Sequence, residues 1–283
     1  MSFAERQINL IFSDVQGTLE LDGLKVSAVV DMPGGTQASA SLQLQIWGMT
    51  LEQMNRFSSV GSQMIAINKP TVTVLAGDVG GKMSNVFEGT IFRSFMDFSA
   101  IPDVALVVSA ITGMYQKAVP GAARHFAGAY NAEDIIQGLA KGIGFHFVNE
   151  GSAHAVIRDE YLYGSPIQQI EKVAHDACLP IEIAHDTVTI WPNDGYRDNE
   201  IIPLSSETGL VGYPSYYEAG FIVKSEFNPQ FEYGRRIQLS SVIPKSNGVW
   251  PAQSVTHELS TQQEDGPWFT TVRLSPPPYV PNN

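Results

Sequence analysis

Residues 220–242 read GFIVKSEFNPQFEYGRRIQLSSV, and this stretch carries the pattern that decides the fold. Residues 221–225 begin with an aromatic and two β-branched side chains, apolar and polar side chains alternate over residues 236–240, and an Asn228-Pro229 pair lies between the two runs. Such runs on both sides of turn residues predict two β-strands, over 221–225 and 236–242, joined by a turn. The C-terminal part of the chain is therefore expected to form a β-sheet.

A second stretch, residues 89–111, matches residues 220–242 without gaps. The identical pairs are Gly89 with Gly220, Ile91 with Ile222, Ser94 with Ser225, and Ser109 with Ser240. The match preserves the apolar alternation and the strand–turn–strand layout, so it predicts two related β domains. Generic strand patterning is the alternative explanation.

The N-terminal residues continue the β pattern. Short alternating runs occur around residues 8–12, 42–46 and 72–74. The Asp22-Gly23 pair stands between two further runs, which is typical of a hairpin turn. Residues 85–98 and 104–111 complete a series of short strands, which favours a barrel or a sandwich.

One helix interrupts these strands. Thr50 is placed to cap a short helix whose apolar positions are Leu51, Met54 and Phe57. The N-terminal region is thus expected to be a β domain with one small helix.

Residues 113–199 have a different pattern. Asn131 precedes a helix that Gly142 and Gly144 end, and the Ser165-Pro166 pair begins a second helix that ends before Pro180. A strand follows the first helix at 145–148, and a hairpin across His185-Asp186 follows the second. We expect a small α+β domain inserted into a β protein.

Composition excludes several classes of function. The net charge of −12 argues against a non-specific nucleic-acid binder and against docking on an anionic membrane. Charged residues are 16% of the chain, whereas soluble proteins average about 25%. This deficit predicts that partner subunits cover much of the surface; the alternative is a solvent-exposed β protein with uncharged polar side chains. No apolar run is long enough to span a membrane, and the first twelve residues lack the form of a signal peptide.

No motif predicts catalysis, a cofactor or a metal. The six histidines have no metal-ligand spacing, and neither a phosphate loop nor a nucleophile elbow is present. Acid pairs such as Glu258 with Glu264, or Asp159 with Glu160, are expected by chance among 29 acids. Cys178, the single cysteine, is expected to be a buried structural thiol on the apolar side of its helix. We therefore expect no catalytic, cofactor-binding or metal-binding residue.

An ordered set of motifs in the C-terminal third points to a family. The motifs are TGLVGYP (208–214), FIVKSEFNP (221–229), GRRIQLSS (234–241), VTHEL (255–259) and GPWFTT (266–271). This order resembles the baseplate hub proteins of contractile-tailed bacteriophages. The resemblance covers residues 200–275 well and the rest of the chain more loosely.

The resemblance implies a mixed, mainly β architecture. It implies two tube-like β-barrel or sandwich domains, 1–112 and 200–275, that flank the inserted α+β domain, 113–199. A Pro-rich tail, 276–283, follows them. Strand edges in 1–112 and 200–275 and the 210–214 loop are the expected interface residues.

The resemblance also implies a structural, non-enzymatic function in the virion. Three chains of a homotrimer present six barrels that join a sixfold tail tube to a threefold spike. The implied partners are tail tube or tube-initiator proteins, the central spike, and wedge or tape-measure proteins. DNA passes through the lumen without specific binding, and an acidic wall suits that passage.

Two alternatives remain. One is a tail-tip or secretion-spike-base protein of a related machine. The other is an acidic β-rich protein that binds or hydrolyses glycans, since Trp47, Trp191, Trp250 and Trp268 are potential sugar platforms.

Overall fold

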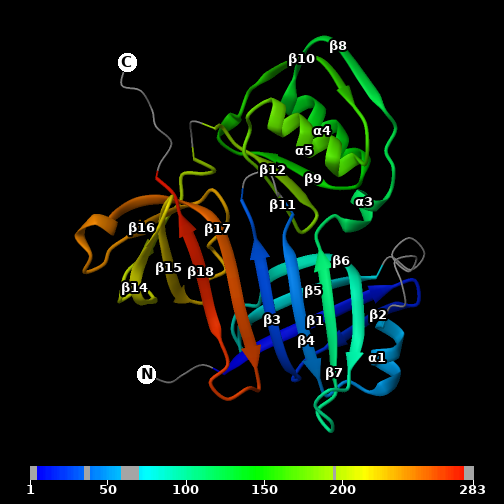
Figure 1. Ribbon diagram of the computed structural model, residues 1–283, viewed down its shortest axis with the longest axis vertical. Helices are drawn as coiled ribbons and strands as arrows, with labels where there is room; N and C mark the ends of the chain where they lie inside the picture. The colour runs from blue at the N-terminus through cyan, green and yellow to red at the C-terminus, as the bar shows by residue number, and fades with distance from the viewer. Residues whose placement is uncertain (1–4, 35–38, 59–69, 194–195, 277–283) are drawn as a thin grey trace. The chain divides into compact units, whose positions relative to one another are not determined.

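The computed structural model describes residues 5–34, 39–58, 70–193 and 196–276 (Figure 1). It confirms the mixed, mainly β fold class. The chain divides into two compact units. The first comprises Met1–Asp31, Ala40–Tyr115 and His257–Phe269; the second comprises Met32–Ser39, Gln116–Thr256 and Thr270–Asn283.

The first group of elements is called here the N-terminal β module. It consists of β1 (Arg6–Asp14), β2 (Gly17–Leu21), β3 (Lys25–Met32), β4 (Ser41–Trp47), α1 (Leu51–Phe57), β5 (Thr71–Asp78), β6 (Ser84–Asp97) and β7 (Ala105–Ile111). Its strands are hydrogen-bonded in the order β3-β4-β7-β6-β5-β1-β2, and all these neighbours are antiparallel. The alternating apolar residues that predict these strands face the core; Val26, Leu44 and Val74, for example, are fully buried.

Strand β6 pairs with its two neighbours, β5 and β7, through different halves of its length. Its first half, residues 84–90, pairs with β5, and its second half, residues 90–97, pairs with β7. Gly89 lies where the two halves meet, and a Cβ atom there would stand 2.8 Å from the carbonyl carbon of Ile111. The close approach of two backbones therefore requires glycine at this position.

Helix α1 forms as the sequence predicts. The Thr50 side chain accepts a hydrogen bond from the backbone N–H of Gln53, and the Gln53 side chain accepts one from the N–H of Thr50, which completes a capping box. The buried residues of the helix are Met54 and Phe57, and the Phe57 ring lies 4.9 Å from that of Phe12. The helix therefore covers one part of the β core.

The hairpin predicted at Asp22-Gly23 is wrong. Strand β2 pairs with β1 across the two-residue turn at Val15 and Gln16, whereas β3 pairs with β4. The Asp14 carboxylate accepts the N–H of Gln16 at 2.8 Å and stabilises that turn. Gly23, with φ of +62°, allows the chain to leave β2 without pairing β2 to β3.

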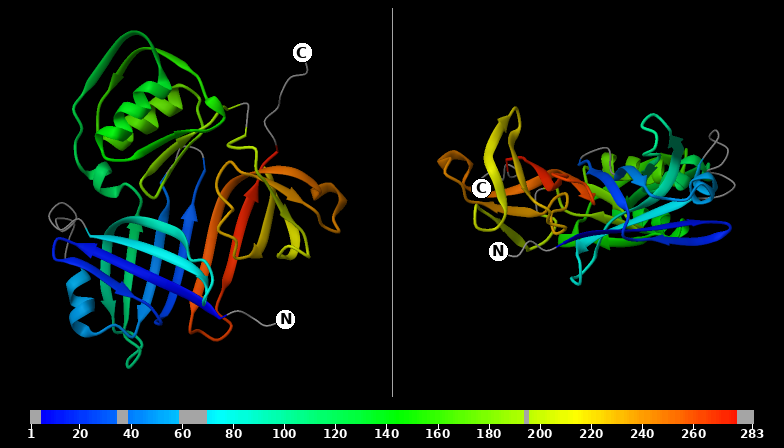
Figure 2. Two further views of the ribbon diagram at one scale, coloured as in Figure 1. Left: turned by 180° about the vertical axis from the view of Figure 1, so that it is seen from behind. Right: turned by 90° about the horizontal axis from the view of Figure 1, so that it is seen from below.

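The middle of the chain forms an inserted α+β segment (Figure 2). Its elements are α3 (Met114–Ala118), β8 (Arg124–Asn131), α4 (Ala132–Gly142), β9 (His146–Asn149), the 3₁₀ turn η1 (Glu150–Ser152), β10 (Val156–Leu162), α5 (Pro166–Asp176), β11 (Ile181–Ala184) and β12 (Thr187–Ile190). The apolar faces of α4 and α5 share one core with the sheet β11-β12-β9 and the ribbon β10-β8.

Both predicted helices of the insert are confirmed. Ser165 caps α5 through a capping box with Gln168. Asn131 precedes α4, but its side chain donates to the Asp134 carboxylate at 3.1 Å and makes no cap hydrogen bond. The ribbon strands β8 and β10 were not expected, since the β8 sequence RHFAGAYN lacks β-branched residues.

The remaining elements are called here the C-terminal β module. They are β13 (Ile201–Leu204), β14 (Leu210–Tyr217), β15 (Gly220–Glu226), β16 (Arg236–Leu239), η2 (Pro244–Ser246), β17 (Gly248–Thr261) and β18 (Trp268–Leu274). Their order is β14-β15-β18-β17-β16-β13. Strand β16 is shorter than the predicted 236–242, because the chain leaves the sheet in a loop that exposes 76% of Val242.

Five strands of the two modules occur in the same order. Replacing β3, β4, β5, β6 and β7 by β14, β15, β16, β17 and β18 converts the order β3-β4-β7-β6-β5 into β14-β15-β18-β17-β16. Four of the five pairs also agree in length: β6 and β17 have 14 residues each, β3 and β14 eight each, and β4, β15, β7 and β18 seven each, whereas β5 has eight residues and β16 four.

The sequence match between residues 89–111 and 220–242 pairs strands that do not correspond in the structure. Gly89 lies in β6, which corresponds to β17, whereas Gly220 begins β15, which corresponds to β4. In addition, β6 and β7 are neighbours, while β18 and β17 separate β15 from β16. Period-two alternation is common to all half-buried strands, so the gapless match compared two different strands.

Candidate functional site

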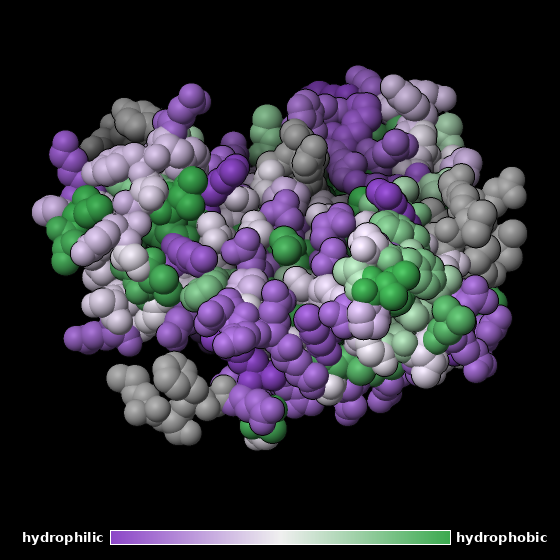
Figure 3. Space-filling model, turned by 60° about the horizontal axis from the view of Figure 1, so that its bottom comes forward, coloured by the Kyte–Doolittle hydropathy of each residue, from purple (hydrophilic) through white to green (hydrophobic). Residues whose placement is uncertain are grey.

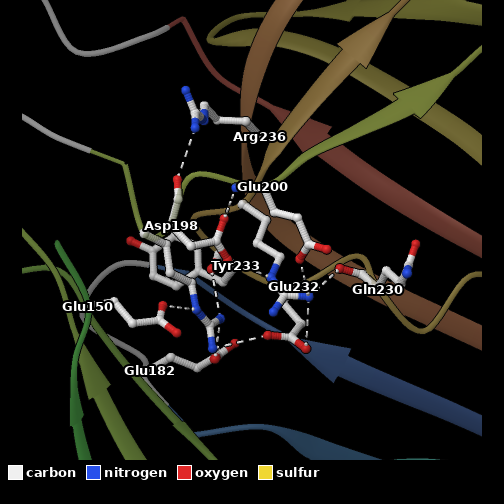
Figure 4. A network of polar contacts seen from close by, with 10 residues as sticks. Glu150, Glu182, Asp198, Glu200, Gln230, Glu232, Tyr233 and Arg236 are labelled. Atoms are coloured by element: carbon white, nitrogen blue, oxygen red, sulfur yellow. Dashed lines mark hydrogen bonds and ion pairs between the residues drawn. The ribbon is translucent and has the colours of Figure 1, made fainter.

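Two oppositely charged residues, Arg197 and Glu182, are buried together, each only 6% exposed. Arg197 lies at the centre of this site. Its guanidinium donates to Glu150 at 2.8 Å and to Glu182 at 2.6 Å, and it lies 3.0 Å from the Glu232 carboxylate (Figure 4). It also donates to the backbone carbonyl of Tyr233 at 3.0 Å. Three carboxylates and one carbonyl thus surround a single guanidinium, and we call this set the Arg197 cluster.

The Arg197 cluster connects two parts of the second unit. Glu150 lies in η1 and Glu182 in β11, both within the insert. Glu232 and Tyr233 lie in the loop between β15 and β16 of the C-terminal β module. The guanidinium also lies over the Trp191 ring, 5.6 Å from its centroid. Arg197 therefore fastens the insert to that loop.

Burial controls the electrostatics of the cluster. Burial raises the pKa of the Glu182 carboxyl, and the charge of Arg197 opposes this rise. Burial alone lowers the pKa of Arg197, but Glu182, Glu232 and Glu150 together raise it above its usual value. The guanidinium consequently stays charged at every physiological pH. Replacing it with an apolar side chain leaves the buried Glu182 carboxylate without a counter-charge, which is costly.

A second group of ion pairs lies beside the cluster and is more exposed. Arg235 contacts Asp198 at 3.0 Å and Glu232 at 3.4 Å, and it donates to the carbonyl of Gln230 at 3.1 Å. Arg236 donates to the carbonyl of Asp198 at 3.1 Å. Because solvent reaches these side chains, each pair contributes less than the buried ones. Together they orient the chain segment that enters β13.

The chemistry of this network is that of a structural joint. The carboxylates of Glu150, Glu182 and Glu232 all face guanidinium groups. Within the described ranges, no group of three His, Cys, Asp or Glu side chains could hold a metal ion. Of the acid pairs noted in the sequence, Glu160 contacts Lys172, and Asp159 accepts the N–H of Gly128 at 2.8 Å.

Cys178 is exposed, so the prediction of a buried thiol is wrong. Helix α5 ends at Asp176, and Cys178 follows its C-cap with φ of +54°. Its N–H donates to the carbonyl of His175 and that of Leu179 donates to Ala174, which forms a Schellman motif. The motif directs buried Leu179 to the core and turns Cys178 outward, at a hollow of about 390 Å³ that His175 and Tyr233 also line.

The predicted interface segment 210–214 is the start of a strand. It belongs to β14, which pairs with β15 on one side and ends the sheet order on the other. Gly212 has φ of +70° within an irregularity of the pairing between Val211 and Ser215. Tyr213 and Tyr216 are 71% and 61% exposed. The structure thus presents an edge strand with exposed aromatic side chains.

Exposed apolar residues are distributed over the surface in small groups. Figure 3 shows one face, on which separate hydrophobic clusters lie among hydrophilic residues. Trp191 and Trp268 are buried, and Trp47 and Trp250 are half-buried, so none forms an open platform for a sugar. Among the described helices, none has the length and apolar character that crossing a bilayer requires.

The Arg197 cluster could not be found from the sequence. Arg197 lies 47 residues from Glu150 and 15 from Glu182, so no local spacing connects them. The single available signal is Glu182 itself, an acidic residue between Ile181 and Ile183 in a strand that is buried on both faces. Such a residue requires a buried counter-charge.

Solved structures with the same fold are tail and secretion proteins. A tail protein from Neisseria meningitidis MC58 aligns with a TM-score of 0.66 and 10% identity, over 95% of this chain and 96% of that one. The 43 kDa tail protein of prophage MuSo2 from Shewanella oneidensis gives 0.64 and 7%, over 95% and 98%. The c3393 protein of E. coli, a type VI secretion component, gives 0.61 and 10%, over 91% and 74%.

Sequence comparison identifies the family. No curated protein matches the chain. The model of the family described as "Baseplate hub gp41" matches residues 29–273, which is most of the chain. The protein therefore belongs to the baseplate hub gp41 family and is a structural protein of the phage baseplate.

Proposed function

We propose that this chain forms a homotrimeric ring at the centre of the baseplate, where it joins a sixfold tail tube to a threefold spike. One observation carries the proposal: five strands of the N-terminal and C-terminal β modules share one order. Two similar modules in each of three chains supply six similar positions around an axis. A threefold assembly can then match a sixfold partner.

The proposed domain organisation follows from the same observation. Residues 1–112 and 200–275 each provide one tube-like module, and residues 113–199 form the insert that Arg197 fastens to the second module through Glu232 and Tyr233. The contacts that reach the second module are those of Arg197 with the Glu232 carboxylate and the Tyr233 carbonyl, and we expect them to hold the insert against that module. The insert is thus suited to support the ring from outside.

The proposed partners are tail tube or tube-initiator proteins on one side of the ring and the central spike on the other. Wedge or tape-measure proteins contact its periphery. DNA passes through the lumen during ejection without specific binding. The net charge of −12 supports this passage, because an acidic wall repels phosphate.

Light scattering on the purified full-length chain tests the proposal. We expect a mass of three chains, either for the protein alone or after it is mixed with the tail tube protein of the same phage. A chain that stays monomeric in both samples contradicts the ring. Measuring binding to a tail tube protein of an unrelated phage in parallel controls for non-specific association.

A further inference from the structure

Two corresponding hairpins lie at one end of the first compact unit. One joins β6 to β7 through residues 98–104, and the other joins β17 to β18 through residues 262–267. The end of β6 pairs with the start of β7, which pairs with the end of β4, and that end pairs with the start of β3. Thr261, the last residue of β17, donates its hydroxyl to the carbonyl of Leu24, just before β3, at 3.0 Å. Both hairpins therefore lie where β3 begins (Figure 1).

The hairpin of the N-terminal β module presents apolar side chains. Its sequence is FSAIPDV, residues 98–104, and its side chains Phe98 and Ile101 are 49% and 74% exposed. We call these two side chains the apolar tip. The turn is held by its own backbone, since the N–H of Asp103 donates to the carbonyl of Ala100 at 2.7 Å. A turn held in this way presents the apolar tip to a partner at a smaller cost in conformational entropy.

The hairpin of the C-terminal β module presents charge instead. Residues 262–267 are QQEDGP, and both acids, Glu264 and Asp265, are exposed. The carbonyl of Gly266 accepts a hydrogen bond from the Arg6 guanidinium at 3.1 Å, which fixes this hairpin to the start of β1. Two connections that correspond in strand order therefore differ in chemistry: one is apolar at its tip, and the other is acidic.

In the proposed ring this contrast repeats three times. The hairpins occupy corresponding positions in the two modules, so six hairpins face one side of the ring and are alternately apolar and acidic. A sixfold partner offers the same surface to all six positions. A pocket that buries the apolar tip at one position would bury Glu264 and Asp265 at the next, and burying unpaired carboxylates is unfavourable. This side of the ring therefore fits a partner with threefold symmetry.

We propose that the 98–104 hairpin is the docking site for the threefold spike, whose surface offers an apolar pocket beside basic side chains. This inference rests on the proposed ring and names the side of the ring, and the residues, that contact the spike. The pocket removes the apolar tip from water, which favours binding. The basic side chains lie opposite Glu264 and Asp265, so the two surfaces are complementary in charge. The tail tube then contacts the opposite side of the ring.

The variant Ile101→Asp in the full-length chain tests this docking site. It places a carboxylate in the apolar pocket, so the affinity for the spike protein of the same phage should fall at least about tenfold in isothermal titration calorimetry. The affinity for the tail tube protein of that phage should stay within about twofold. Ile101 is exposed in the single chain, so folding should be retained, which circular dichroism checks. Light scattering should still give a mass of three chains.

The matched control is Val242→Asp. Val242 is 76% exposed, almost the same fraction as Ile101, but it precedes β17, at the opposite end of that strand from the 262–267 hairpin. The control should bind the spike protein within about twofold of the wild type. Equal losses of spike binding in the two variants mean that any added charge weakens the complex, and they overturn the inference.

The outcomes distinguish the docking site from the ring itself. A trimer whose Ile101→Asp variant binds the spike as well as the wild type does overturns the docking site and leaves the ring. Loss of tube binding in place of spike binding assigns this side to the tube, and loss of the trimer places the hairpin between copies; both results overturn the inference. A wild-type trimer that binds no spike contradicts the proposed partner as well. A monomer in every sample overturns the ring and the docking site together.

Site-specific photocross-linking identifies the partner without a loss of affinity. Ile101→p-benzoylphenylalanine, illuminated in the mixture of trimer, spike and tube proteins, should give a covalent product that mass spectrometry identifies as this chain joined to the spike. The same substitution at Val242 should give less than about a tenth of that product. A product that contains the tube protein and not the spike contradicts the docking site.

The acidic hairpin provides a test of the charge complementarity. Glu264→Gln combined with Asp265→Asn should weaken spike binding less than Ile101→Asp does, and it should reduce the dependence of the affinity on salt. The reason is that the basic side chains of the spike lose their counter-charges, whereas the apolar tip remains covered. A salt dependence equal to that of the wild type contradicts a basic surface opposite this hairpin.

Discussion

The two β modules share a strand order, but one connection between corresponding strands has a different structure in each module. Between β4 and β5 the N-terminal β module carries α1, which packs Met54 and Phe57 against the core. Between the corresponding strands β15 and β16, the C-terminal β module carries a loop with Glu232 and Tyr233, which bind Arg197. One module uses this connection to close its own core, and the other uses it to hold the insert.

The two modules can share a strand order without sharing a sequence. Strand order is maintained by backbone hydrogen bonds and by apolar alternation, which many sequences satisfy. The connection carries the particular task of each module, so its residues are not interchangeable. The four predictions below test this contrast.

Replacing Arg197 should produce the largest effect. We expect Arg197→Met to destabilise the protein by about 3–5 kcal/mol, because Glu182 then remains buried without a counter-charge. Urea unfolding at pH 7, followed by tryptophan fluorescence, measures the loss. The double variant Arg197→Met with Glu182→Met removes both charges and should recover most of the stability. A loss below about 1 kcal/mol for the single variant contradicts a buried ionic joint.

In the N-terminal β module, the residue that anchors the corresponding connection is Phe57 of α1. Phe57→Ala should destabilise the protein by about 3 kcal/mol, because it opens a cavity against Phe12. The matched control on the same helix is Leu51→Ala, since Leu51 is 63% exposed and its loss should cost less than about 0.5 kcal/mol. Equal effects in denaturant unfolding argue against an apolar closure by α1.

A buried histidine in the C-terminal β module should make the stability of the protein depend on pH. His257 in β17 corresponds by position to Arg93 in β6, and burial lowers the pKa of His257 to about 4. An unfolded histidine binds a proton near pH 6.5, so the unfolded state holds more protons between pH 6.5 and 4. The free energy of unfolding should thus fall by about 3 kcal/mol as the pH drops through this window. His257→Gln should remove most of this dependence in denaturant unfolding at several pH values, and an unchanged slope contradicts the assignment.

The smallest effect concerns the cap of α1, for which the C-terminal β module has no equivalent helix. Thr50→Ala should cost about 1 kcal/mol, because it removes the hydrogen bond to the N–H of Gln53. Thr50→Ser keeps the hydroxyl and should stay within a few tenths of the wild-type value in thermal unfolding. Similar melting temperatures for the Ala and Ser variants contradict a contribution from the cap.

The elements predicted correctly are those that neighbouring residues specify. Thr50 and Ser165 mark the starts of α1 and α5, and the strand predicted over residues 221–225 lies within one residue of the observed ends of β15. In each case the physical cause is local: a side chain binds a backbone group three residues away, or a strand exposes alternate faces. The fold class follows from these elements.

The failures concern what distant residues do. The Asp22-Gly23 turn carries the usual signal for a hairpin, but β2 finds its partner in β1. Cys178 sits in an apolar pattern, yet the helix ends before it and directs it outward. The Arg197 cluster joins residues that no spacing relates. The partner of a strand, the end of a helix and the counter-charge of a buried residue all depend on contacts between residues that are distant in the sequence.

The amino-acid sequence by itself determined that this chain is mainly β with an inserted α+β segment, and its ordered motifs indicated the hub family. Only the tertiary structure decided which strands are equivalent. The physical reason is that period-two alternation records which face of a strand is buried, but it contains nothing about the neighbour along each edge. Strand order is set by backbone hydrogen bonds, which every residue can accept and every residue except proline can donate, so the order that the two modules share is visible in the strand pairing and not in the amino-acid sequence.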